Sequence, residues 1–309
     1  MSKILGLHHM TAICGDAQRN LDFYTGVLGL RLIKITVNFD DPTAYHLYYG
    51  DGVASPGTIL TFFPYPTSLQ GRPGVGQCVI TSLSIPVTSL EYWRARLAEF
   101  STPSDRDGAI DFSDPDGLLL RLVADPKYKL HGPWDKSTVP VEHQICGMHS
   151  VTLQESEVEK TSALLMRILG FRHDEDAEVP EYVFLVEEKG TGKRVDVATL
   201  GFGVGRPGKG TVHHIAFRTA TDATQAELMA DLSEVRAPVS EVRDRDYFHS
   251  IYFREPGGVL FEIATDTPGF TTDEDLEHLG TRLCLPKVHE PRRTLIEGAL
   301  PKLRLPGTV

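Results

Sequence analysis

Residues 27–31 read VLGLR and residues 168–172 read ILGFR. This repeated stretch decides the fold, because the two copies mark equivalent positions in two copies of a larger unit. The glycines of the two copies, Gly29 and Gly170, lie 141 positions apart. Similarity at a long fixed spacing is the signature of an internally duplicated chain. We therefore expect two related halves.

The segment upstream of each copy repeats as well. HHMT at residues 8–11 matches MHSVT at residues 148–152, and a shift of 140 positions aligns His9 with His149. This match extends the similarity to the first strand of each half.

A second pair of matches covers the later part of each half. GRPGVG at residues 71–76 matches GRPGKG at residues 205–210, a shift of 134 positions that aligns Ile80 with His214. Further on, FSDPDGLLLRLVAD matches FREPGGVLFEIATD and aligns Arg121 with Glu262. Since each half contains two such regions, the chain divides into quarters.

Each quarter has the pattern of a strand, a helix and several further strands. In the first quarter, alternating residues at 9–13 precede Gly15 and Asp16, a helix-capping signal, and then an apolar stripe formed by Leu21, Tyr24 and Leu28. The equivalent helices are expected around Leu90–Leu97, at 156–169 and at 222–235. This pattern predicts an α+β fold of four βαβββ modules, paired into two open, barrel-like sheets.

The length of 309 residues favours two domains. We expect residues 1–135 to hold the N-terminal pair of modules and residues 136–270 the C-terminal pair. Residues 271–309 lie outside the repeat and contain a short Pro-bounded helix with Leu295, Ile296 and Leu300. We expect this tail to pack on the body.

The amino-acid composition limits which kinds of molecule the protein is expected to bind. A net charge of −11 and the lack of any Lys/Arg run argue against nucleic acid. Stretches long and apolar enough for a membrane span or a leader peptide are also missing, and the four cysteines are widely spaced. The sequence thus favours a cytoplasmic protein with reduced thiols, and it leaves open whether the protein forms a homo-oligomer.

The aligned positions single out one candidate metal site. Glu262 stands between Phe261 and Ile263 in an apolar strand, where a carboxylate is costly unless something pairs with it. The first half has lost this carboxylate and one histidine, because Arg121 and Ile80 occupy their places. Two histidines and one carboxylate form the facial triad that suits non-haem Fe(II) and leaves coordination positions open. We therefore predict His9, His214 and Glu262 as ligands of Fe(II).

At this point the chain resembles the vicinal oxygen chelate superfamily, which includes glyoxalases, fosfomycin-resistance proteins and extradiol dioxygenases. The stretches that begin at HHMTAICGDAQRN and at DRDYFHSIYFREPGG, together with LPKVHEPRR in the tail, are similar to hydroquinone-type ring-cleaving dioxygenases. The resemblance implies the same three ligands. It also implies pocket roles for Arg245, Tyr252, Thr11, His8 and His213.

The resemblance further implies an Fe(II)-dependent, extradiol-type ring-cleaving dioxygenase. Its substrates would be hydroquinone, or a related aromatic diol, and O2. Two other functions remain open: a glyoxalase-like metal-dependent isomerase or lyase, which usually needs a second carboxylate ligand, and a non-catalytic protein that binds aromatic compounds or confers resistance to them.

Three points about the histidines stay open at this stage. Neighbouring residues in a strand face opposite ways, so His8 and His213 reach the pocket only through a β-bulge or from an adjoining surface. His149 replaces His9 as ligand if the third and fourth modules pair. Either His249 or His213 is a candidate general base.

Overall fold

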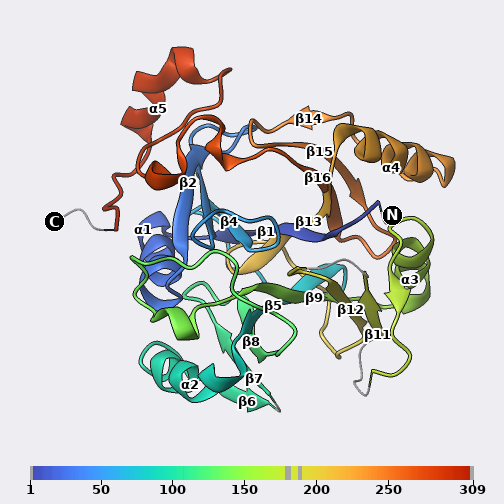
Figure 1. Ribbon diagram of the computed structural model, residues 1–309. Coiled ribbons are helices and arrows are strands. Elements are labelled where there is room, and N and C mark those ends of the chain that lie inside the picture. Colours follow the sequence, from blue (N-terminus) through green and yellow to red (C-terminus); the bar gives the residue numbers. More distant parts are fainter. Residues whose placement is uncertain (1–2, 107, 178–181, 187–189, 307–309) are drawn as a thin grey trace.

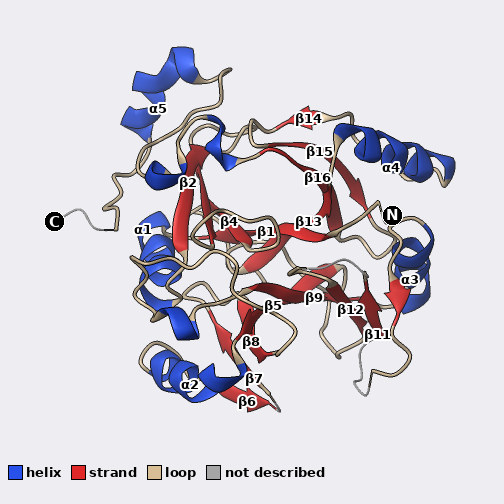
Figure 2. Ribbon diagram, viewed as in Figure 1, coloured by secondary structure: helices blue, strands red, loops and turns tan. Residues whose placement is uncertain are grey.

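Two eight-stranded sheets form the centre of the molecule, and the helices lie around them (Figure 2). The computed structural model describes residues 3–106, 108–177, 182–186 and 190–306. The chain runs four times through a strand, a helix and three strands, which confirms the predicted α+β fold.

The first sheet combines the first and fourth modules, in the order β14-β15-β16-β13-β1-β4-β3-β2 (Figure 1). Its strands are β1 (Gly6–Cys14), β2 (Arg31–Val37), β3 (Tyr45–Gly50), β4 (Ile59–Pro64), β13 (Thr211–Thr219), β14 (Arg243–Asp244), β15 (Phe248–Arg254) and β16 (Leu260–Pro268). At its centre β1 pairs with β13 in antiparallel fashion, so the sheet joins the two ends of the chain.

The second sheet combines the second and third modules, in the order β10-β11-β12-β9-β5-β8-β7-β6. Its strands are β5 (Gln77–Ile85), β6 (Ser104–Arg106), β7 (Ala109–Ser113), β8 (Leu119–Ala124), β9 (Gly147–Gln154), β10 (Arg172–His173), β11 (Tyr182–Leu185) and β12 (Arg194–Ala198). Here β5 and β9 are the antiparallel pair at the centre. Each sheet therefore takes one module from residues 1–135 and one from residues 136–270. The predicted division at residue 135 concerns the repeated halves of the sequence, and it does not coincide with the division into two sheets.

The helices begin and end close to where the apolar stripes predict them. They are α1 (Ala17–Leu21), which continues as a π-helix over Asp22–Val27, then α2 (Leu90–Ala98), α3 (Val158–Arg167), α4 (Asp222–Glu234) and α5 (Arg293–Ala299). The predicted cap is present, because the Asp16 side chain accepts a hydrogen bond from the Arg19 backbone N–H at 2.7 Å. Leu21, Tyr24 and Leu28 are all buried. Short 3-10 turns cover Val87–Ser89, Val141–His143, Phe270–Thr272, Leu276–His278 and Glu290–Arg292.

The structure corrects one alignment of the two halves. Gly6 and Gly147, which open β1 and β9, have nearly the same backbone angle, with φ of 130° and 131°. They are 141 positions apart, so His149 corresponds to His8, and Ser150 corresponds to His9. The shift of 140 that paired His9 with His149 is wrong by one residue, and in a strand one residue reverses the face of every side chain.

The tail lies against the first module. The Lys34 ammonium, which is fully buried, contacts the Asp273 and Glu274 carboxylates at 2.5 Å each. Ile296 of α5 and the following Leu300 are buried, whereas Leu295 is 65% exposed. The tail is therefore joined to the body by an ion cluster around Lys34, by a few apolar side chains and by hydrogen bonds such as that from the Cys284 N–H to the Ile35 carbonyl at 2.9 Å.

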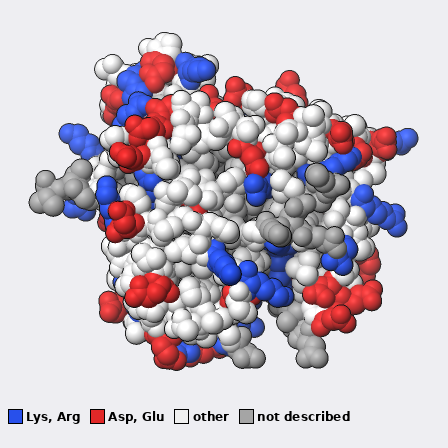
Figure 3. All heavy atoms as spheres, viewed as in Figure 1, with Lys and Arg blue, Asp and Glu red and all other residues white. Residues whose placement is uncertain are grey.

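The surface mixes both signs of charge. On the face drawn in Figure 3, acidic and basic side chains are interspersed, and no wide basic area extends over the drawn residues. Of the helices in the described ranges, not one has the length and apolar character needed to cross a bilayer.

Candidate metal centre

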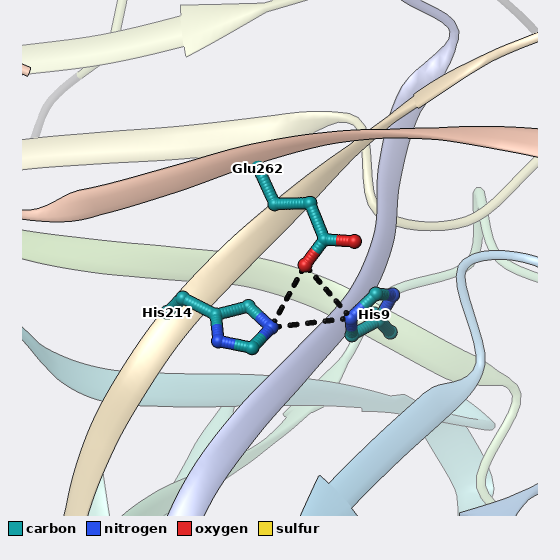
Figure 4. Close-up of side chains that lie close together, drawn as sticks. All are labelled: His9, His214 and Glu262. Atoms are coloured by element: carbon teal, nitrogen blue, oxygen red, sulfur yellow. Dashed lines mark hydrogen bonds and ion pairs between the residues drawn. The ribbon is translucent and has the colours of Figure 1, made fainter. Parts of the chain in front are cut away.

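Three adjacent strands of the first sheet bring the three predicted ligands together (Figure 4). His9 comes from β1, His214 from β13 and Glu262 from β16. Glu262 Oε2 lies 2.9 Å from His214 Nε2 and 3.5 Å from His9 Nε2, and the two Nε2 atoms are 3.4 Å apart. Three ligand atoms each about 2.1 Å from one ion and at right angles to one another lie about 3 Å apart. The three side chains therefore fit a single metal ion.

Burial and charge make this cluster unusual. All three side chains are buried, and Glu262 Oε2 is without a hydrogen-bond donor. Burial acts to raise the pKa of Glu262, but the His9 and His214 imidazoles outweigh it and hold that pKa well below 4.5. Burial lowers the pKa of His214 despite the nearby carboxylate, and a metal ligand must be a neutral imidazole. A buried carboxylate oxygen without a donor is stabilised by a cation beside it, which fits a metal site here.

The neighbouring histidines stand behind the ligands. The pairing of β1 with β13 shifts register between Leu7 and His9 and again opposite His213, so His8 and His213 are the extra residues of two β-bulges. His8 Nδ1 lies 2.9 Å from His9 Nδ1, and His213 Nδ1 lies 2.8 Å from His214 Nδ1. A hydrogen bond at Nδ1 orients a ring that binds metal through Nε2.

The carboxylate also has a partner. The Ser250 hydroxyl donates to Glu262 Oε1, which leaves Oε2 for the side of the two imidazoles. Together the bulged histidines and Ser250 orient each of the three candidate ligands.

A cavity of about 360 Å³ opens beside the cluster. This volume lies at the lower end of the range for ligand sites and is ample for one small aromatic ring. Its walls are formed by His9, Asn38, Phe39, Asp40, His46, Tyr48, Phe63, His213, His214, Arg243, Arg245, Phe248, Tyr252, Leu260 and Glu262. At the mouth Asp40 lies 3.5 Å from the Arg243 guanidinium and 3.4 Å from that of Arg245.

Three of the five predicted pocket residues line this cavity. Arg245, Tyr252 and His213 do so, and the Arg245 Nε–H donates to the Tyr252 hydroxyl at 3.3 Å. His8 and Thr11 do not: His8 lies behind His9, and Thr11 is fully buried beside Thr61. The resemblance predicts both in the pocket, but the bulge turns His8 to the back of its neighbour.

The remaining histidines lie elsewhere. His249 Nδ1 contacts the Asp222 carboxylate at 2.7 Å at the start of α4, and His249 is not among the residues that line the cavity. His149 belongs to β9 in the second sheet and lies 3.4 Å from Asp125. It does not replace His9 in the cluster.

The second sheet lacks a comparable cluster in its described residues. Ile80 and Arg121 hold the places of His214 and Glu262, as the aligned sequences predict, and Ser150 holds that of His9. Arg121 Nε donates to the Asp111 carboxylate at 2.5 Å. The second site has thus exchanged metal-ligand chemistry for an ion pair.

Several cavity residues escaped the sequence analysis. His46 and Tyr48 stand two apart in β3, and Phe39 and Asp40 belong to the loop before it. The alternation in YHLYYG puts His46 and Tyr48 on one face, a signal that could have found them.

Comparisons with known proteins place this geometry in a family. The model of the Glyoxalase/Bleomycin resistance protein/Dioxygenase superfamily matches residues 6–122 and again residues 147–263. A Bacillus subtilis protein, MhqO, named provisionally as a ring-cleaving dioxygenase, is 42% identical, with 97% of each chain covered. A chlorohydroquinone/hydroquinone 1,2-dioxygenase of Sphingobium indicum is 34% identical over 91% of each chain.

A solved structure agrees with these relatives. The crystal structure of a Bacillus subtilis protein, described provisionally as a dioxygenase, superimposes with a TM-score of 0.93 at 41% identity and covers 99% of each chain. The two family matches also begin 141 residues apart, as the backbones of β1 and β9 do. This chain therefore belongs to the Glyoxalase/Bleomycin resistance protein/Dioxygenase superfamily.

Proposed function

We propose that this protein is an Fe(II)-dependent, extradiol-type ring-cleaving dioxygenase that inserts both atoms of O2 into hydroquinone or a closely related aromatic diol. The observation that carries the proposal is the buried group of His9, His214 and Glu262 beside a cavity of about 360 Å³. Relatives named for ring cleavage cover nearly the whole chain and include a hydroquinone dioxygenase.

The donor set favours iron over the metals of isomerases. Two imidazoles and one carboxylate on one side of an ion form the facial triad of non-haem Fe(II) oxygenases. In the described residues the group contains a single carboxylate, whereas a glyoxalase-like isomerase usually needs a second. Fe(II) bound there would supply the electron transfer between an aromatic diol and O2 that oxygen insertion requires.

The protein's own side chains orient the three metal ligands and neutralise charge on the substrate. His8 and His213 fix the rings of the two ligand histidines through Nδ1, and Ser250 fixes Glu262 through Oε1. The Arg245 guanidinium offsets negative charge on the substrate oxygen, because it carries a permanent charge in a half-enclosed cavity.

Tyr252 keeps its proton near neutral pH, and this fits it to donate a hydrogen bond to the same oxygen. Burial raises the pKa of its phenol above 10, and Glu262 adds to the rise. The aromatic rings of Phe39, Phe63 and Phe248 give the substrate ring an apolar surround that excludes water. We also infer a cytoplasmic location, since all four cysteines are free thiols.

The test is oxygen uptake by protein purified without oxygen and loaded with Fe(II). Hydroquinone, chlorohydroquinone, methylhydroquinone and catechol are supplied in parallel, and the product is identified by mass. We expect one O2 consumed per hydroquinone and a product heavier by two oxygen atoms.

A matched pair of variants links the activity to the cluster. His214→Ala should lose both bound iron and oxygen uptake, whereas His249→Ala, in the same module but outside the cavity, should keep both. Oxygen uptake with catechol alone would move the protein to another branch of ring-cleaving enzymes, and no uptake with any diol would overturn the proposal.

A further inference from the structure

A row of four hydrogen-bonding side chains runs along the first sheet from β1 to β3. Thr11 Oγ1 and Thr61 Oγ1 are 2.7 Å apart, and Thr61 Oγ1 lies 2.8 Å from His46 Nε2. The row ends at Tyr48, whose hydroxyl lies 2.8 Å from His46 Nδ1. The metal centre as described above uses none of these contacts.

All four members of this row are buried and uncharged near neutral pH. Burial lowers the pKa of the His46 imidazole well below 6.5 and raises that of the Tyr48 phenol well above 10. A neutral imidazole has one donor nitrogen and one acceptor nitrogen. The direction of one of the two hydrogen bonds to His46 therefore fixes the direction of the other.

Tyr48, at the end of the row, lines the same cavity as the candidate metal ligands. In the sheet order, β13, β1 and β4 separate β16 from β3, yet Tyr48 and Glu262 line the same cavity. Glu262, Tyr252 and Arg245 all influence the Tyr48 phenol electrostatically, so the curl of the sheet brings the two sides within interaction range. An aromatic ring anchored at the cluster by one hydroxyl would extend toward Tyr48.

We propose that Tyr48 determines specificity: its phenolic oxygen accepts a hydrogen bond from the second hydroxyl of the diol, the one that is not at the metal. His46 is the positioning residue. With Tyr48 donating to His46 Nδ1, His46 Nε2–H donates to Thr61, and the lone pairs of the phenolic oxygen remain for the substrate.

This assignment rests on the proposed function, and it predicts which aromatic diols the cavity prefers. In hydroquinone the second hydroxyl stands at the opposite end of the ring from the first, so it can reach the far wall of the cavity. In catechol the two hydroxyls are adjacent, so the second stays at the metal side. The row therefore favours para-diols over ortho-diols.

The test is binding and does not need turnover. Dissociation constants for hydroquinone and for phenol, which lacks the second hydroxyl, are measured by calorimetry on the Fe(II)-loaded full chain without oxygen. We expect the wild type to prefer hydroquinone and Tyr48→Phe to weaken hydroquinone binding by about 10-fold, the loss of one buried hydrogen bond, with phenol binding unchanged.

Neighbouring variants separate this role from a structural one. Tyr49→Phe is the matched control, because Tyr49 points to the other face of β3, donates to Asn20 and lies outside the cavity walls. It should leave both dissociation constants unchanged. His46→Gln should weaken hydroquinone binding in the same direction as Tyr48→Phe but by less, again without affecting phenol.

The outcomes are distinguishable from failure of the proposed function. Equal weakening of hydroquinone and phenol by Tyr48→Phe, or no change in either, would overturn the role of Tyr48 even in an active dioxygenase. Selective weakening in a protein that consumes no O2 would support Tyr48 and reject the dioxygenase.

Discussion

A buried carboxylate outside the metal centre, Glu155, gives a sharp prediction about stability and pH. Glu155 follows β9, is fully buried, and neither of its carboxylate oxygens has a hydrogen-bond partner. Burial, and secondarily the nearby Glu255, raise the pKa of Glu155 to about 8. Glu255 itself is satisfied, since it accepts from the Thr161 hydroxyl at 2.6 Å and from the Val259 N–H at 2.8 Å.

A raised pKa in the folded state destabilises the protein as the pH increases. Below pH 4.5 Glu155 is protonated whether the chain is folded or not, so its ionisation does not change the free energy of unfolding. Above that pH the unfolded chain releases the proton while the folded chain keeps it, so unfolding becomes easier by about 1.4 kcal/mol per pH unit up to the folded pKa of about 8. The cost at pH 7 is about 3 kcal/mol by this reasoning.

Glu155→Gln should remove that cost, because the amide has nearly the same shape and never ionises. We expect the variant to exceed the wild type in free energy of unfolding by less than about 1 kcal/mol at pH 5 and by about 3 kcal/mol at pH 7. Urea denaturation at pH 5, 6, 7 and 8 measures the difference.

The matched control is Glu157→Gln. The Glu157 side chain is 67% exposed and lies 3.4 Å from Lys160, so its replacement should change stability by less than about 0.5 kcal/mol at every pH. If the gain from Glu155→Gln is the same at pH 5 and pH 7, or absent, then the carboxylate is not held in its protonated form and the reasoning fails.

Other parts of the molecule give further predictions. Ser250→Ala removes the donor to Glu262 Oε1 and should weaken Fe(II) binding by about 10- to 100-fold in a chelator titration, and unchanged affinity would show that Ser250 does not orient the ligand. Lys34→Met leaves two carboxylates without their buried cation and should lower the free energy of unfolding by about 3–5 kcal/mol in urea, whereas an effect below 1 kcal/mol would show that the tail is held by other contacts. Gly29→Ala should lower the melting temperature, because φ is +68° and the new methyl would meet Val139 at 2.5 Å, whereas Gly26→Ala, with nothing within 4 Å, should not; equal effects would contradict the steric argument.

The sequence predicts the modules well because each carries its own periodicity. The stripe at Leu21, Tyr24 and Leu28 and the cap at Asp16 are local signals, and all four residues have the expected positions. Which modules share a sheet is not a local property. Repeated sequences show that four units are alike, but they do not show which strand edges form hydrogen bonds, and here the first unit pairs with the fourth.

The same contrast holds at the site. Glu262 stands out because a carboxylate in an apolar strand needs a partner, and the comparison with Arg121 shows that only one half retains it. The alternation of their strand puts His46 and Tyr48 on one face but does not show what that face contacts, because aromatic residues are common in strands for packing alone. Their proximity to the cluster follows from the curvature of the sheet, which no single strand encodes.

The antiparallel contact of β1 with β13 has a consequence for biosynthesis. A ribosome releases the strand bearing His9 roughly two hundred residues before the strand bearing His214, so the candidate metal centre stays incomplete until translation is nearly finished. The second sheet is made of consecutive modules, so it can form before the first sheet is complete. Truncated products that end before the last quarter therefore carry only one of the three candidate ligands, His9, and lack the complete cluster.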